Sequence, residues 1–136
     1  MRSIAYRKGY KYQLNEPYIV LLPELLARVD VDTQYISWDG YTLVIKKGYA
    51  WDGPSGPTID TKDFMRGSLV HDALYQLMRE GYLSGSYRKA ADQILKRMCI
   101  EDGMLYPIAQ VVYAAVRLFA RFAADPSSKK PVEHAP

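Results

Sequence analysis

The chain has 136 residues, of which 49% are hydrophobic and 24% are charged, and its formal net charge is +3. These proportions are typical of a folded globular protein, so they exclude wholesale disorder, a collagen-like chain and a low-complexity scaffold. The excess of basic residues is small and scattered, so we expect no nucleic-acid partner, and the single cysteine, Cys99, excludes an intramolecular disulfide.

The first third of the chain predicts an antiparallel sheet. Alternating and apolar runs predict strands at residues 10–14, 18–22, 34–38 and 41–47. Asp39-Gly40 separates the last two runs and indicates a hairpin in which both turn positions have positive φ. Pro23 and the residues after it could form a single helical turn.

Residues 48–61 contain three glycines and two prolines, so we expect no regular structure there. The segment could carry a functional site or could only lead the chain from the sheet to the helices. Three helices are predicted after it, at residues 62–80, 86–101 and 107–124. The link between the first two is short, so they should pack as antiparallel neighbours.

The predicted fold class is therefore α+β, a small N-terminal antiparallel sheet followed by three helices. We expect one domain over residues 1–124, which is β-rich at 1–47, a loop at 48–61 and helical at 62–124. Residues 125–136 read as a polar, proline-rich flexible tail. The N-terminus has no apolar stretch typical of a signal peptide, and no segment is long and apolar enough for an ordinary membrane-spanning helix.

The third predicted helix is apolar around most of its circumference, apart from a stripe that contains Arg117 and Arg121. An ordinary surface helix has one apolar face, so something beyond the local core should cover this one. The N-terminal sheet, a second copy of the chain, a phage protein or a lipid surface could do so. The two arginines could bind phosphates or carboxylates at its rim.

His71 lies in the middle of the first predicted helix and is the candidate for catalysis. Tyr75 follows at i+4 on the same face of the helix as His71, and Asp72 projects about 100° away from that face. Asp92 lies on the second predicted helix, where it could hydrogen-bond His71, fix its tautomer and stabilise the imidazolium. The alternatives are that His71 is a half-buried structural residue and that Asp92 pairs with Arg88, four residues earlier on its own helix.

Asp72 also lies near the glycine-rich loop, whose backbone carbonyls are hard oxygen ligands of the kind that calcium takes together with a carboxylate. This pattern makes calcium the expected cofactor.

Three motifs resemble a phage and prophage family of unknown function: the loop that begins Trp51-Asp52-Gly53, the helix His71-Asp-Ala-Leu-Tyr75, and the helix Arg88-x-x-x-Asp92. The resemblance covers about residues 35–122. It implies a phage or prophage origin, and with it a location in the virion or the host cytoplasm.

The same residues are similar to the catalytic core of the secretory phospholipase A(2) superfamily, in which a calcium loop precedes a His-Asp-x-x-Tyr helix. The resemblance implies that His71 is the general base, Tyr75 a structural hydroxyl and Asp92 the orienting carboxylate. It also implies that calcium is bound by Asp72 and by the carbonyls of the loop residues Trp51, Gly53 and Ser55. The single cysteine and the N-terminal β region differ from that superfamily.

The sequence is therefore compatible with two functions. One is a non-catalytic virion or accessory component of a phage, which contacts phage structural proteins or itself through the third helix. The other is a calcium-dependent hydrolase of lipid esters, which acts on phospholipid of the bacterial envelope with a dyad of His71 and Asp92.

Overall fold

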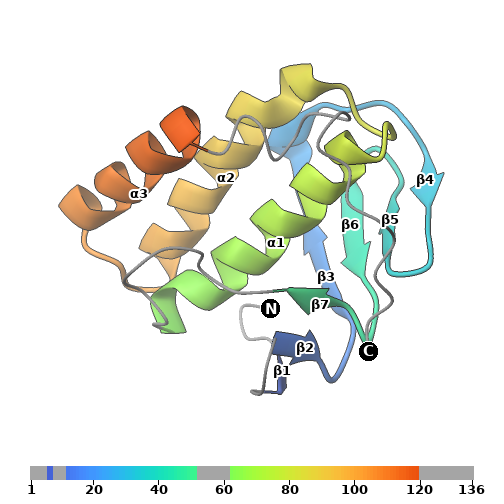
Figure 1. The fold of residues 1–136 in the computed structure, drawn as a ribbon, viewed down its shortest axis with the longest axis horizontal. Coiled ribbons are helices and arrows are strands. Elements are labelled where there is room, and N and C mark those ends of the chain that lie inside the picture. Colours follow the sequence, from blue (N-terminus) through green and yellow to red (C-terminus); the bar gives the residue numbers. More distant parts are fainter. Residues whose placement is uncertain (1–5, 8–11, 52–61, 120–136) are drawn as a thin grey trace. The chain divides into compact units, whose positions relative to one another are not determined.

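The computed structural model describes residues 6–7, 12–51 and 62–119, and it has the predicted α+β class (Figure 1). The chain divides into two compact units at Gly53 and Pro54. The first unit contains the described strands, and the second contains the described helices α1, α2 and α3. The division falls inside the predicted loop at residues 48–61.

The described strands form two antiparallel sheets. One has the strand order β3-β6-β5-β4, with β3 (Tyr18–Leu21), β4 (Val31–Asp32), β5 (Ile36–Trp38) and β6 (Thr42–Ile45). The other has the order β1-β2-β7, with β1 (Tyr6–Arg7), β2 (Tyr12–Leu14) and β7 (Ala50–Trp51). The four predicted strands correspond to β2, β3, β5 and β6. The other three have two residues each, too few to show a period in the sequence.

The expected hairpin joins β5 to β6, and Trp38 pairs with Leu43 across it. The expectation of two positive φ angles is wrong for Asp39, because Gly40 alone of the pair has one, at +94°. Asp39 instead begins the turn: its carboxylate accepts hydrogen bonds from the backbone N–H groups of Tyr41 and Thr42. An aspartate in this role closes the turn with its side chain and keeps an ordinary backbone conformation.

Alternation along β5 and β6 gives their sheet one buried face. Ile36, Trp38, Leu43 and Ile45 have no exposed surface. The indole N–H of Trp38 donates to the carbonyl of Ala27, so this polar group is also satisfied inside the unit. Pro23 begins the expected single helical turn, a 3-10 turn over Pro23–Leu25.

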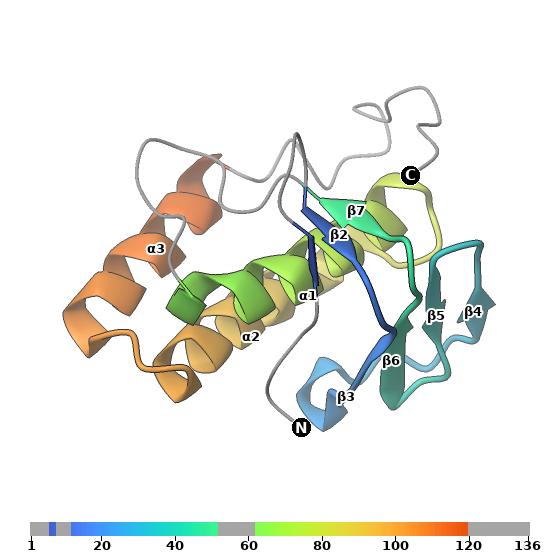
Figure 2. The same ribbon diagram turned by 90° about the horizontal axis from the view of Figure 1, so that it is seen from below.

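The helical unit begins with an antiparallel pair, α1 (Lys62–Arg79) and α2 (Arg88–Glu101) (Figure 1, Figure 2). A 3-10 turn (Gly85–Tyr87) precedes α2, and the Ser84 hydroxyl caps it by accepting from the N–H of Ser86. Gly67 lets the two helices approach closely: a Cβ there would lie 3.0 Å from Leu95 Cδ1 and 3.2 Å from Cys99 Sγ. The predicted antiparallel packing is confirmed, and the bounds of the two helices agree with the predicted ones to within two residues.

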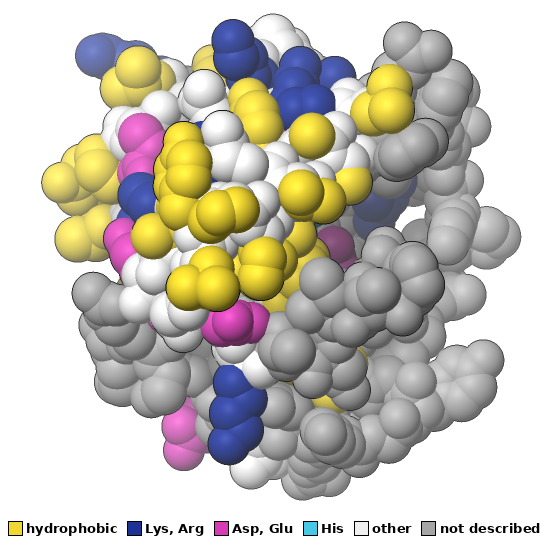
Figure 3. Space-filling model, turned by 90° about the vertical axis from the view of Figure 1, so that its left-hand side faces the viewer, with side chains coloured by type: hydrophobic (Ala, Val, Ile, Leu, Met, Phe, Trp, Pro, Cys, Tyr) yellow, Lys and Arg dark blue, Asp and Glu magenta, His cyan; other side chains and the backbone are white. Residues whose placement is uncertain are grey.

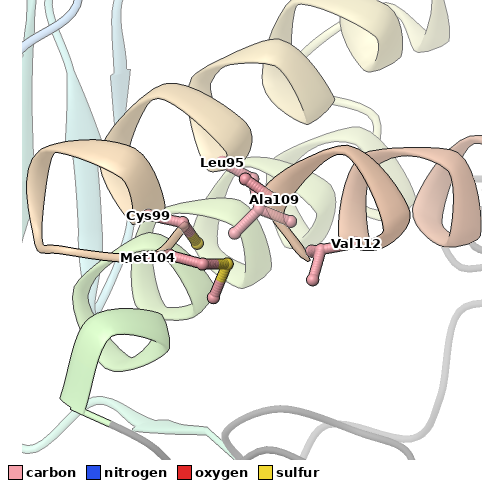
Figure 4. Packing of buried hydrophobic residues seen from close by; sticks show 5 residues of the cluster. All are labelled: Leu95, Cys99, Met104, Ala109 and Val112. Atoms are coloured by element: carbon pink, nitrogen blue, oxygen red, sulfur yellow. The ribbon is translucent and has the colours of Figure 1, made fainter. Parts of the chain in front are cut away.

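The third helix, α3 (Tyr106–Phe119), packs on α2 through a small apolar core. Figure 4 shows this core, which consists of Leu95, Cys99, Met104, Ala109 and Val112. The two buried residues of α3 in it, Ala109 and Val112, are three positions apart and occupy one face of the helix. The described part of α3 therefore uses a single face against α2.

The rest of α3 presents apolar side chains to solvent. Val111 is 68% exposed, Leu118 is 66% exposed and Ile108 is 44% exposed. Figure 3 views the molecule from the side of α3 and shows hydrophobic side chains gathered on that face. The expectation that this helix has more apolar surface than its own core covers is confirmed for the described residues. Within the described ranges, no helix combines the length and hydropathy that crossing a membrane requires.

Candidate functional site

Asp92 lies at the centre of a buried polar cluster formed by all three helices. Its side chain has no exposed surface. Oδ1 lies 2.7 Å from His71 Nε2 and accepts a hydrogen bond from the Tyr75 hydroxyl at 2.5 Å. Oδ2 accepts one from Arg117 Nη1 at 2.9 Å and lies 3.6 Å from Arg88 Nη1. One carboxylate thus contacts two residues of α1, one of α2 and one of α3.

Helical spacing explains how these side chains meet. His71 and Tyr75 are at i and i+4 on α1, and their ring centroids lie 4.2 Å apart. Arg88 and Asp92 have the same spacing on α2. Because α1 and α2 run antiparallel and share a tight interface, the middle of α1 faces the first turns of α2.

The pKa of Asp92 is lowered from the ordinary value of an aspartate. Burial alone raises it, but hydrogen bonds from His71 and Tyr75, the charge interaction with His71 and the hydrogen bond from Arg117 together outweigh the burial. Asp92 is therefore an ionised carboxylate at neutral pH, and such a group only accepts hydrogen bonds.

The charge of Asp92 determines which ring nitrogen of His71 carries the shared proton. Since the carboxylate cannot donate, Nε2 of the ring must carry the proton that joins them, and the neutral ring then has its lone pair on Nδ1. Among the described residues, none hydrogen-bonds Nδ1. The side chain of His71 is 8% exposed. This arrangement holds the imidazole at Nε2 and leaves Nδ1 without a hydrogen-bond partner among the described residues.

Tyr75 reinforces the negative charge on Asp92. The pKa of its hydroxyl is raised above the usual value, first by burial and then by the hydrogen bond to Asp92 and its charge. The Arg88 guanidinium opposes this shift in part. Tyr75 therefore stays protonated and acts as a hydrogen-bond donor, the structural contact expected from the sequence.

The predicted hydrogen-bonding distance between His71 and Asp92 is confirmed. The alternative partner of Asp92, Arg88, is present as well, because the second carboxylate oxygen faces it. Asp72 follows His71 on α1 and is half-buried. The catalytic roles of His71, Tyr75 and Asp92 and the calcium role of Asp72 remain predictions.

The predicted calcium loop lies largely outside the described residues, and Gly53 and Ser55 fall there. Trp51 is described: it belongs to β7 and pairs with Tyr12 of β2. The expectation of no regular structure in residues 48–61 is therefore wrong at Ala50 and Trp51, where the strand begins before the glycine- and proline-rich part. Within the described ranges, no three or more His, Cys, Asp or Glu side chains gather as a metal site.

Sequence reasoning missed the contact of Arg117 with Asp92. The sequence makes Arg117 and Arg121 available for phosphates or carboxylates at the rim of the third helix, and Arg121 lies outside the described residues. In the structure its Nη1 binds Asp92, and its side chain is 30% exposed. Arg117 is the only charged residue of α3 as described, and that isolation in an apolar helix was the available signal.

Comparison with known proteins gives one result. A family model described as "Protein of unknown function (DUF1353)" matches residues 27–116, more than half of the chain. The matched segment contains His71, Tyr75, Arg88 and Asp92 and ends one residue before Arg117. No curated protein and no solved structure matches the chain. The chain belongs to the DUF1353 family, whose function is unknown.

Proposed function

We propose that the protein is a hydrolase of lipid esters that uses His71 as its general base. The observation that supports this proposal is the 2.7 Å contact between His71 Nε2 and the ionised, buried carboxylate of Asp92. A histidine held in this way has a defined tautomer and a basic second nitrogen, which is what a general base requires.

In the proposed reaction, Nδ1 of His71 removes a proton from a water molecule as the water oxygen attacks the ester carbonyl carbon. The bond to the alcohol then breaks, and the imidazolium returns the proton to the leaving alkoxide. Asp92 stabilises the imidazolium between these steps, and proton transfer of this kind contributes about 10²–10⁴-fold to a rate. A calcium ion with Asp72 as its carboxylate ligand would supply charge stabilisation for the oxyanion.

The test is calcium-dependent release of fatty acid from phospholipid vesicles. His71→Ala should reduce the rate by about 10²-fold or more, because it removes the base. His134→Ala, the same change at the other histidine of the chain, is the matched control and should retain the rate. Wild-type protein that is inert on every lipid in the presence of calcium, or His71→Ala that retains the rate, would contradict the proposal.

The calcium part of the proposal has its own test. Asp72→Asn removes the proposed carboxylate ligand, so calcium titrated onto the protein should bind more weakly. Asp32→Asn is the matched control, because it removes the same charge from an exposed side chain of the β unit. Equal calcium affinity in wild type and Asp72→Asn would rule out Asp72 as a ligand.

A second candidate function follows from the exposed side of α3. Ile108, Val111, Ala115 and Leu118 are all exposed and recur at intervals of three and four residues. This spacing is that of the contact seam between two packed helices, and none of the four is charged, so the seam can pair with its own copy. We propose, as the second candidate function, that this protein is a virion or accessory component of a phage and that two copies of it associate through this seam.

Sedimentation of the purified protein tests that assembly. Val111→Glu places a charge in the seam and should shift a self-associated wild type to monomer. Gln110→Glu adds the same charge at the neighbouring exposed position and should leave the mass unchanged. Wild type that is monomeric at every concentration would contradict self-association.

A further inference from the structure

We infer that Arg88 and Arg117 form a binding site for a phosphate group beside the carboxylate that holds His71. The inference deepens the proposed hydrolase function, on which it rests for the nature of the substrate, because it assigns that substrate an anionic group. The binding itself can be measured without any catalysis.

The local charge around Asp92 favours an anionic ligand. Two guanidinium groups contact Oδ2 of a single carboxylate, Asp92, while Oδ1 contacts the uncharged hydroxyl of Tyr75 and the imidazole of His71. Among the described residues, no other carboxylate contacts either arginine. Arg88, Arg117 and Asp92 together therefore carry a net charge of +1.

Another arginine on the same pair of helices has different surroundings. Arg66 of α1 forms ion pairs with both Glu101 and Asp102 at the end of α2, and its side chain is only 6% exposed. There Glu101 also pairs with Arg97, so the two carboxylates balance two arginines, and Arg66 is closed off from solvent. At Asp92 the arginines outnumber the carboxylate, and the side chains of Arg88 and Arg117 are 18% and 30% exposed.

Arg88 and Arg117 also have N–H donors beyond those that contact Asp92. A guanidinium has five N–H donors in a planar fork. Both Nη1 atoms face Asp92, and that of Arg88 also donates to the carbonyl of Arg117. Arg88 makes one further hydrogen bond, to the Tyr75 hydroxyl. The remaining donors match the bidentate recognition of a phosphate by arginine.

The location suits the proposed chemistry. The guanidinium groups and the imidazole contact the two oxygens of one carboxylate. A single substrate molecule could therefore place its phosphate group at the arginines and its ester group at His71. A phospholipid carries its phosphate a few bonds from its ester groups. The shared chemistry is the phosphate group, whether it comes from a lipid headgroup or from a free phosphate.

Titration with inorganic phosphate at low salt, followed by NMR of the arginine side-chain N–H groups, tests the site. Phosphate should shift the signals of Arg88 and Arg117. Arg88→Gln should weaken phosphate binding by about tenfold or more, because a charge-assisted hydrogen bond is lost. Lys89→Gln removes the same charge from the next, exposed position and should weaken binding much less. Arg88→Lys, which keeps the charge and the fold but loses the fork, should also bind phosphate less tightly than wild type.

Two outcomes would overturn the inference: no phosphate-dependent shift at either arginine, or equal losses in Arg88→Gln and Lys89→Gln. Competition with a short-chain anionic phospholipid below its micelle concentration separates the two sources. A lipid that displaces phosphate indicates a headgroup site, and a lipid that does not indicates a free phosphate ligand. Phosphate binding that persists in His71→Ala, with no lipid hydrolysis by wild type, would leave this site standing while the hydrolase proposal falls.

Discussion

His71 Nε2 and Asp92 Oδ1 lie 2.7 Å apart, although 21 positions of the chain separate the two residues. The contact joins α1 to α2, and Arg117 of α3 binds the other oxygen of the same carboxylate. A single buried charge therefore ties three helices together and holds the histidine in one orientation. Both the stability of the helical unit and the basicity of Nδ1 depend on that charge.

Asp92→Asn should strongly destabilise the protein. The substitution keeps the shape of the side chain but leaves the two arginines without a counter-charge. It also replaces one carboxylate oxygen, which accepts hydrogen bonds, with an NH2 group, which only donates them. Loss of one partner from a buried ion pair costs about 3–5 kcal/mol. Urea unfolding followed by circular dichroism measures the free energy of unfolding.

The control for this experiment is Asp32→Asn. Asp32 pairs with Lys46, but its side chain is 78% exposed, so water replaces the lost contact. Its free energy of unfolding should hardly differ from that of wild type. An equally small effect for Asp92→Asn would show that the buried cluster does not stabilise the fold.

Acid should remove the contribution of Asp92. Because its folded pKa is below the unfolded value of about 3.9, its stabilisation is complete above about pH 4 and is lost as the pH falls through the lowered folded pKa. The difference in unfolding free energy between wild type and Asp92→Asn should therefore shrink below about pH 4. A difference that stays constant down to the acid transition would contradict the lowered pKa.

Tyr75 should show the opposite dependence on pH. Its folded pKa is raised above the unfolded value of about 10, so its contribution is present below about pH 10 and is lost as the pH rises further. In an ultraviolet titration of the 12 tyrosines, one should ionise after the ordinary ones, and Tyr75→Phe should abolish that late step. An unchanged titration of the variant would assign the late step to another tyrosine.

Cys99 should be chemically inert in the native protein. Its side chain is buried in the core between α2 and α3, and burial, followed by the charges of Asp63 and Asp102, raises its pKa to about 12. The thiolate is the reactive form, so a thiol reagent at neutral pH should modify the native protein slowly and the urea-unfolded protein rapidly. Equally rapid modification of the native protein would indicate that this core opens readily.

The helices and the hairpin were predictable because their signals are local. Apolar residues recur along α1 and α2 with the period of a helix, and Asp39-Gly40 marks the turn of the hairpin. The strands β1, β4 and β7 have two residues each and are defined by pairing with distant partners, which the sequence pattern does not contain.

In the candidate site, too, the contacts with local sequence signals were predictable and the contact that depends on tertiary packing was not. The i and i+4 spacing on α1 and the short link to α2 bring His71 and Tyr75 to Asp92, so this part followed from helix geometry. The contact of Arg117 did not follow, because it depends on the angle at which α3 packs on α2. That angle is set by the interlocking of Ala109 and Val112 with Leu95 and Cys99, which periodicity does not specify.

The central claim, that Asp92 holds His71 with its proton on Nε2 and its lone pair on Nδ1, is tested most directly by NMR of isotope-labelled imidazole nitrogens. At a pH where the ring is neutral, the spectrum should show His71 in a single tautomer, with Nε2 bonded to hydrogen and Nδ1 unprotonated. Asp92→Asn, in any fraction that folds, should lose this strict preference. A wild-type spectrum with the proton on Nδ1, or with both tautomers in fast exchange, would contradict the account.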